Sequence, residues 1–493
     1  MKIQTSEEKL NYVKKYLDKL MSIAEQATEK ERYNLALSAL SAYCRIQYTI
    51  NQVYTDQKAE NLLLQISEKT VSIPTGFQGE KNTVLFYDGF GLDRRGIAIV
   101  MCRAIVKNGY HLVYASPLNT KEKQPTLKKS LDGYNVDWVY YDTDSPFLRT
   151  ISDIERIIKK YCPFFAFLYT TPNDVSGVAL FDSLKGKCFR CQLDLTDHAF
   201  WIGTNAFDMC NGGRQFSASI EHYERGISKK SLSFLDANLF IDDCSFQGLP
   251  FDVNNRFIFS GGQLYKTLGD ENDTFYKIIE HVLNKFPDIA FLYAGSGDSS
   301  KMHQLIQKFP EKAFLIPERP DFYQIIERCT LYLNTYPMFG GLMMRYAALA
   351  GKLPITLRHE NDSDGILIEQ QNRRIEYDSF VDLIEDIDKL LSDESYLRER
   401  EKLLIGSVVT EECFIRNIRM LIENHETEFK YDEIKPVDTS QFRKEYVERF
   451  EIAELSPLIA QKRNLMLMPF FPRLFVHRLL CKIQAKIFKG EQL

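Results

Sequence analysis

Short apolar runs alternate with helix-like segments twice along this chain of 493 residues. The first series runs from TVLFYD (83–88) to CFRCQLDL (188–195), and the second runs from RFIFSGG (256–262) to LPITL (353–357). These runs are too uniformly apolar to expose one face to water, so they predict parallel strands covered by helices on both sides. The alternation therefore predicts an α/β fold with two doubly wound, Rossmann-like domains that face each other across a cleft.

A helical segment precedes the first series. Over residues 5–70 apolar residues recur at helical spacing among many charges, and no glycine or proline interrupts them. The break at residues 73–76 ends this segment. We therefore predict a helical N-terminal extension (1–75), a first Rossmann-like domain (76–250), a second (251–430) and a helical tail (431–493).

Composition limits the class of partner and the compartment. The net charge is −5, whereas a surface that binds nucleic acid carries an excess of lysine and arginine, so we expect no nucleic acid partner. The charged start lacks the apolar core of a secretory signal, and no stretch reaches the roughly 18 apolar residues that cross a bilayer. We therefore expect a cytoplasmic protein. Cys188 and Cys191 have no second pair at zinc-site spacing, which favours reduced, mostly buried thiols.

The loops after four successive strands of the second series carry most of the chemistry. They read SGGQLYK (260–266), AGSGD (294–298), PERPDF (317–322) and YPMFGGLM (336–343). A helix that starts after Gly340 and Gly341 offers unpaired N–H groups and a positive dipole end to a phosphate. Lys266 can add the positive charge that a diphosphate needs. Neither GxxxxGK[ST] nor GxGxxG is present in these loops, so a kinase or an NAD enzyme fits less well.

The motifs QLYK (263–266) and LNTYPMFGGLMMRYAALAGKLPI (333–355) resemble the donor half of GT-B glycosyltransferases of the bacterial polysaccharide and O-GlcNAc-transferase-like branch. The resemblance covers roughly residues 80–410. It implies that the QLYK lysine and the glycine-rich helix start touch the donor diphosphate, and that residues 317–319 meet the base and ribose. With three neighbours from the same loops added, the predicted donor contacts are Gly261, Gly262, Tyr265, Lys266, Gly295, Pro317, Glu318, Arg319, Gly340, Gly341, Leu342 and Met343.

One motif of many retaining members is missing. They carry paired glutamates in an E-x7-E pattern at the last glycine-rich loop, where this chain has Tyr336, Pro337 and Met338. Retention or inversion of the anomeric centre therefore stays open. Enzymes of this class use helix dipoles and lysine in place of a cation, and the acidic loop at 360–364 lacks regular ligand spacing. We expect no metal and no cofactor besides the donor substrate.

The first domain is expected to bind the acceptor. In TDHAFWIG (196–203), Asp197 and His198 follow the strand-like CFRCQLDL, which places them at the ligand-binding end of that strand. A histidine there can take the proton of an attacking hydroxyl or bond the donor sugar, and the resemblance also implies a histidine in this loop. The alternative is a structural histidine packed beside Trp201. The predicted catalytic residues are thus His198, Asp197 and Lys266.

Two further charged stretches have weaker interpretations. Asp93, Arg94 and Arg95, in the loop after the first strand, can contact an acceptor, and a solvated turn explains them equally well. The lysines of GISKKSL (226–232) are interpreted as a surface connection.

The tail from residue 461 to 493 combines cations with large apolar residues. Such a helix suits the surface of an anionic membrane, and packing back on the first domain is the equal alternative. Pro469 and Pro472 interrupt any single long helix. An oligomer through the N-terminal helices is a further expectation.

The sequence therefore favours a glycosyltransferase that moves a hexose or N-acetylhexosamine from a UDP-sugar, or another nucleotide-diphosphate sugar, to a hydroxyl of a glycan or lipid-linked saccharide. A protein O-glycosyltransferase, a nucleotide-sugar epimerase of the same fold and a non-catalytic partner subunit are the alternatives. A peripheral position on the inner face of the membrane would fit a lipid-linked acceptor.

Overall fold

The computed structural model describes residues 5–93, 97–194, 196–358, 366–430 and 433–490. Packing divides the chain into two compact units. Unit 1 comprises residues 1–235 together with 415–493, and unit 2 comprises residues 236–414. Both the helical N-terminal extension and the tail thus belong to the same unit as the first sheet, and so do residues 415–430, which were predicted as the end of the second domain.

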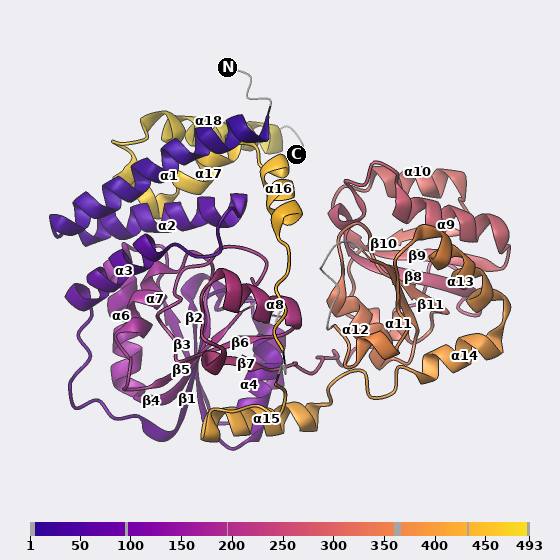
Figure 1. The fold of residues 1–493 in the computed structure, drawn as a ribbon, viewed down its shortest axis with the longest axis horizontal. Helices are drawn as coiled ribbons and strands as arrows, with labels where there is room; N and C mark the ends of the chain where they lie inside the picture. Colours follow the sequence, from indigo (N-terminus) through magenta and orange to yellow (C-terminus); the bar gives the residue numbers. More distant parts are fainter. Residues whose placement is uncertain (1–4, 94–96, 195, 359–365, 431–432, 491–493) are drawn as a thin grey trace. The chain divides into compact units, whose positions relative to one another are not determined.

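Unit 1 contains a parallel sheet of seven strands in the order β3-β2-β1-β4-β5-β6-β7 (Figure 1). In β4 every residue except Phe164 is buried, which is why the run FFAFLYT shows no alternation of polar and apolar residues. The strands are β1 (Glu80–Asp88), β2 (His111–Pro117), β3 (Val136–Tyr141), β4 (Pro163–Tyr169), β5 (Phe189–Leu193), β6 (Met209–Gly212) and β7 (Leu232–Phe234). The helices between them are α4 (Ala98–Lys107), α5 (Pro125–Ser130), α6 (Phe147–Tyr161), α7 (Val175–Asp182) and α8 (Gln215–Ser219), which continues as a π-helical turn (Ile220–Glu224).

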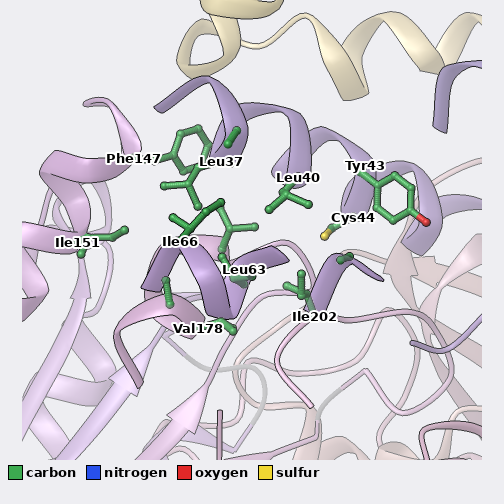
Figure 2. Close-up of a cluster of buried hydrophobic side chains, with 14 of the residues drawn as sticks. Leu37, Leu40, Tyr43, Cys44, Leu63, Ile66, Phe147, Ile151, Val178 and Ile202 are labelled. Atoms are coloured by element: carbon green, nitrogen blue, oxygen red, sulfur yellow. The ribbon is translucent and has the colours of Figure 1, made fainter. Parts of the chain in front are cut away.

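The N-terminal extension folds as three helices, α1 (Ser6–Glu29), α2 (Tyr33–Ile50) and α3 (Gln57–Thr70). The helix starts are set by side chains: Thr5 and Glu8 form a capping box at α1, and Asp56 accepts the first N–H groups of α3. Figure 2 shows how Leu37 and Leu40 of α2 pack with residues of α3, α6 and α7 in one apolar core. The extension is therefore part of the core of unit 1. The expected oligomer through these helices stays a prediction.

The C-terminal part of unit 1 returns to these helices. It contains the end of α15 (Glu411–Asn424), then α16 (Ser440–Arg449), α17 (Leu455–Ile459), a 3₁₀ helix (Lys462–Leu467) and α18 (Pro472–Gly490). Phe471 is buried, and its ring stacks on Tyr16 of α1 with centroids 5.9 Å apart. Arg463 donates to Ser145 O at 3.0 Å and lies over the ring of Phe147. Residues 455–471 thus pack on unit 1.

Unit 2 contains a second parallel sheet, of six strands in the order β10-β9-β8-β11-β12-β13. Its core is separate from that of unit 1. The strands are β8 (Arg256–Gln263), β9 (Ile289–Ser296), β10 (Ala313–Ile316), β11 (Leu331–Leu333), β12 (Pro354–Leu357) and β13 (Glu376–Tyr377). The helices are α9 (Thr274–Lys285), α10 (Ser300–Lys308), α11 (Phe322–Ile326), α12 (Gly341–Leu349), α13 (Phe380–Ser392) and α14 (Glu394–Lys402).

Both sheets have the strand order of a doubly wound Rossmann fold, in which the first three strands are added on one side of the sheet and the later strands on the other side of the first strand. This confirms the prediction of two doubly wound, Rossmann-like domains with a helical N-terminal extension. The strands β6 and β13 lie beyond the two series recognised in the sequence, because each is too brief to show a period. No helix in the described parts of the chain is both long and apolar enough to cross a bilayer.

Candidate functional site

The topological switch of the second sheet lies between β8 and β11, which are neighbours in the sheet and lead to strands on opposite sides. Ligands bind at such a point, beyond the carboxyl ends of the strands. The loop after β8 carries Lys266, and the loop after β11 runs to Gly340. The two loops are bonded to each other: Lys266 Nζ donates to Phe339 O at 3.2 Å, and Met338 N donates to Lys266 O at 3.2 Å. The predicted lysine and the predicted glycine-rich helix start therefore meet.

Glycines are required here by close packing. A Cβ on Gly295 would lie 1.9 Å from Gly262 O, its partner on the neighbouring strand, and a Cβ on Gly340 would lie 2.8 Å from Asn334 Oδ1. Gly262 has a φ of +132°, which side chains other than glycine rarely adopt. A Cβ on Gly261 would meet Ala294 O at 3.1 Å. Gly295, predicted as a donor contact, thus has a packing reason of its own.

The start of α12 lies beside the Lys266 loop. Among the described residues no side chain caps this helix, whose N-cap is Gly340. The loop before it is held from below, because Asn334 Oδ1 accepts from Gly340 N at 3.1 Å and Thr335 Oγ1 donates to Met338 O at 2.7 Å. Leu342, in the first turn, and Tyr265, beside Lys266, are each 53% exposed. The helix start, the lysine and these two side chains share one open edge of unit 2.

The third predicted donor loop follows β10. Pro317 and Glu318 are exposed at its tip. Arg319 is largely covered, and its Nε donates to Asp321 Oδ1 at 2.8 Å; Asp321 Oδ2 also accepts from Gln247 N at 2.7 Å. Arg319 thus takes part in an internal ion pair, and the contact of this loop with a base and ribose stays a prediction. Met343 of α12 lies close to the loop after β8: its Cε would be 3.4 Å from a Cβ placed on Gly261.

In unit 1, Asp197 and His198 follow β5 as predicted. Asp197 is buried and accepts from Arg214 Nε at 2.8 Å and from Ser217 Oγ at 3.0 Å. Burial alone would raise the pKa of Asp197, but the charge of Arg214 and the bonds from Arg214 and His198 hold this pKa well below its usual range. His198 Nδ1 lies 3.5 Å from Asp197 Oδ1, and the imidazole is 34% exposed. An ionised carboxylate beside Nδ1 leaves Nε2 as the nitrogen that can exchange a proton with a ligand.

The surroundings of His198 differ from the structural alternative considered from the sequence. Its ring lies edge-on to Tyr48 and Phe442, at centroid distances of 6.4 and 6.5 Å. Trp201 is buried instead against Arg225, whose guanidinium carbon lies 4.2 Å from the centroid of the indole ring. Among the described aromatic contacts, His198 has none with Trp201.

The N-terminal helices hold the loop that carries His198. Asn51, at the end of α2, is fully buried and donates from Nδ2 to His198 O at 2.7 Å. Glu60 of α3 accepts from Gly203 N at 2.8 Å and from Thr204 N at 3.1 Å. Burial raises the pKa of Glu60 to about 7, against the pull of these N–H groups. Residues 196–204 are therefore positioned by a segment that lies far earlier in the sequence.

A buried ionic cluster beneath this loop was missed by the sequence analysis. Arg225 is completely buried; it donates to Ala199 O at 2.7 Å and to Tyr54 O, and its Nε lies 4.0 Å from Asp194 Oδ2. Burial, and then the charge of Asp194, raises the pKa of Glu221 well above its ordinary value. The only sequence signal was the acid at the end of a strand, Asp194, since nothing local marks Glu221 or Arg225 as buried.

The remaining charged candidates have structural partners, are exposed, or lie outside the described residues. Asp93 accepts from Leu127 N at 2.9 Å and from Thr126 N at 3.2 Å, which caps α5. The lysines at 229 and 230 are exposed, as a surface connection requires. Arg94, Arg95 and the acidic residues Glu360, Asp362 and Asp364 lie outside the described residues. Within the described parts of the chain, no group of three His, Cys, Asp or Glu is placed to hold a metal ion.

Neither a protein-family model nor a curated protein matches the sequence. Solved structures do match. A glycosyltransferase from Rickettsia africae superposes with a TM-score of 0.50 and 12% identity, over 70% of this chain and 100% of its own. A mutant O-GlcNAc transferase from Thermobaculum terrenum superposes with a TM-score of 0.48 and 12% identity, over 91% of this chain and 82% of its own. A UDP-N-acetylglucosamine 2-epimerase superposes with a TM-score of 0.49 and 11% identity, over 73% of this chain and 100% of its own.

At this level of identity the similarity concerns the fold. The strand orders of both sheets and the superposition on the Rickettsia africae glycosyltransferase agree. The chain has the fold of GT-B glycosyltransferases: two Rossmann-like α/β domains, here with a helical N-terminal extension.

Proposed function

We propose that this chain is a glycosyltransferase that takes a hexose or N-acetylhexosamine from a UDP-sugar and transfers it to a hydroxyl of a glycan or lipid-linked saccharide. The GT-B fold supports a nucleotide-sugar enzyme only as a class. The particular reaction rests on the chemistry of the two loops at the switch point of unit 2.

One observation carries the proposal: Lys266 and the start of α12 lie together at the switch point, with Lys266 Nζ 3.2 Å from Phe339 O. As the bond to the sugar breaks, negative charge grows on the leaving diphosphate. An ammonium group and a helix N-terminus stabilise that charge more than they stabilise the bound donor, which lowers the barrier. The exposed side chains of Tyr265 and Leu342 would cover the nucleotide.

Unit 1 supplies the acceptor side in this proposal. His198, with its Nδ1 beside the ionised Asp197, accepts the proton of the attacking hydroxyl at Nε2. The bond from the hydroxyl oxygen to the anomeric carbon forms as the bond to the diphosphate breaks, so charge passes from nucleophile to leaving group. We expect the reaction to need no metal, because Lys266 and the helix dipole supply the positive charge.

The experiment is transfer and hydrolysis of a radiolabelled UDP-sugar by the wild type, by Lys266→Ala and by a control, Lys308→Ala. Lys308 is an exposed lysine of the same unit, paired with Glu280 at 2.8 Å. Loss of one preorganised donor to a leaving group typically costs roughly 10²–10³ in kcat. We expect that loss for Lys266→Ala and wild-type turnover for Lys308→Ala.

Three results would contradict the proposal. Equal turnover by Lys266→Ala and the wild type would remove the lysine from the mechanism. A new sugar isomer in the NMR spectrum of a UDP-sugar incubated without acceptor would identify an epimerase, and the absence of any heat on titration with UDP would indicate a non-catalytic subunit.

A further inference from the structure

The C-terminal segment of unit 1 exposes an unusual amount of apolar surface. The described residues include 21 large apolar side chains that are exposed, and 8 of them lie between residues 465 and 483. We call this set the tail face. It consists of Leu465, Met466, Met468, Phe470, Val476, Leu479, Leu480 and Ile483. Single exposed apolar residues are common on proteins, but a contiguous group marks a binding surface.

The geometry of α18 explains why this surface is exposed. Val476, Leu479, Leu480 and Ile483 are spaced as neighbours on one face of a helix, and their exposed fractions range from 47% to 59%. Leu474 and Phe475, in the first turn, pack against the core of unit 1. Further along the helix the opposite side carries His477, Arg478 and Lys482, so α18 is amphipathic and its apolar face suits a second apolar environment.

Within the segment that carries the tail face, the formal charges have one sign. Residues 461–483 contain no Asp or Glu and five cations, in a chain whose net charge is −5. Arg463 is used inside unit 1, and the other four are Lys462, Arg473, Arg478 and Lys482. The partner of this surface is therefore apolar at its centre and negatively charged around it.

A cavity of about 390 Å³ opens beside the start of α18, between this helix and α1. Its apolar walls include Tyr12, Tyr16 and Phe470, and its cations are Lys15, Lys19 and Arg473. Lys19 Nζ donates to Phe470 O at 2.6 Å and lies 4.7 Å from the centroid of the Phe471 ring, which fixes the position of the turn before α18. The cavity extends the same combination of apolar surface and positive charge onto α1.

We propose that the tail face binds the surface of an anionic lipid bilayer, with α18 lying in the plane of the membrane. The apolar side chains would enter the boundary between headgroups and acyl chains, and the flanking cations would meet lipid phosphates. A second copy of the chain fits less well: in a symmetric dimer the same patch would face itself, which brings cations against cations. The inference does not rest on the proposed glycosyl transfer, although a lipid-linked acceptor would be found at such a surface.

The test is co-sedimentation of the full-length protein with vesicles. We compare vesicles of phosphatidylglycerol and phosphatidylcholine with vesicles of phosphatidylcholine alone. We expect binding to the anionic vesicles that weakens as salt is raised, because exposed charges are screened. Leu479→Glu removes apolar area and adds a negative charge, so its partition coefficient should fall on the order of tenfold or more.

The matched control is Val381→Glu, which changes a valine of α13 in unit 2 that is 60% exposed. It should bind vesicles as the wild type does, and both variants should keep the wild-type melting temperature and the wild-type affinity for UDP.

Three outcomes would overturn the inference: no binding to the anionic vesicles, equal binding to both kinds of vesicle, or equal binding by Leu479→Glu and the wild type. A dimer in light scattering that Leu479→Glu converts to a monomer would also overturn it, and would identify the tail face as an interface between copies.

Discussion

The Lys266 loop of unit 2 and the His198 loop of unit 1 both follow a strand of a parallel sheet, but different forces hold them. The Lys266 loop is shaped by its own backbone: Gly295 packs where no side chain fits, Gly262 has a positive φ that favours glycine, and the loops after β8 and β11 bond to each other. The His198 loop is held by side chains from other elements, namely Asn51, Glu60 and Arg225. The geometry of the Lys266 loop therefore depends on residues close to it, whereas the geometry of the His198 loop depends on the rest of its unit.

The largest expected effect is on stability, in unit 1. Arg225→Ala removes the donors to Ala199 O and Tyr54 O and leaves the carboxylate of Asp194 buried without its charged partner. Breaking such a buried pair costs about 3–5 kcal/mol. Urea unfolding should show this loss, whereas Arg449→Ala, at an exposed ion pair with Glu445, should change the unfolding free energy by at most about 1 kcal/mol. Equal effects from the two variants would mean that the cluster does not brace the loop.

A second effect appears as pH dependence. The folded protein holds the proton of Glu60 up to a pKa of about 7, whereas the unfolded chain releases it near the ordinary value of 4.5. The folded state therefore binds more protons in this window, so stability falls as the pH rises from about 4.5 to about 7, by about 3 kcal/mol. Glu60→Gln should remove that fall.

Urea unfolding of the wild type and Glu60→Gln at pH 5 and pH 8 measures the difference. The two proteins should be close at pH 5, and the variant should be the more stable one at pH 8. The same pH dependence in both proteins would show that Glu60 is not held in its protonated form.

In unit 2 the third prediction concerns the close approach of two strands beneath the Lys266 loop. Gly295→Ala places a methyl group where Gly262 O lies 1.9 Å away, so β8 and β9 must shift at the base of the Lys266 loop. Overpacking of this kind costs about 1–3 kcal/mol. We expect weaker UDP binding by calorimetry together with the loss of stability. Gly213→Ala, where a Cβ meets nothing within 4 Å, serves as the control. Unchanged UDP affinity in Gly295→Ala would separate these strands from the donor site.

The smallest expected effect concerns the function of the His198 loop. Asn51→Ala removes the donor to His198 O and should cost about 1–2 kcal/mol of stability at this buried site. Because Asn51 lies in unit 1, the affinity for UDP should stay as in the wild type, and turnover should fall with a changed pH profile. A fall in UDP affinity without any change of kcat would contradict the assignment of the two loops to different tasks.

The same contrast explains how much could be predicted from the sequence. The glycines, Lys266 and the strand period are local signals, and they predicted the fold class and the meeting of the loops after β8 and β11. Asp197 and His198 were predicted from their place after a strand. The network of Asn51, Glu60 and Arg225 could not be predicted, because each residue bonds to a partner far along the chain: Asn51 and His198 are 147 positions apart. Polar residues of this kind resemble surface residues until the fold buries them.

The return of the C-terminal segment to α1 has a consequence during synthesis. Lys19 and Phe470, which are bonded in the finished molecule, are 451 positions apart, so the first helices leave the ribosome long before the residues that cover them. Until residues 455–471 have been translated, the apolar sides of α1 and α2 that pack against them stay open to water and to other nascent chains. Such transiently exposed surface is prone to aggregate, so residues 455–471 cover a surface that left the ribosome well before them.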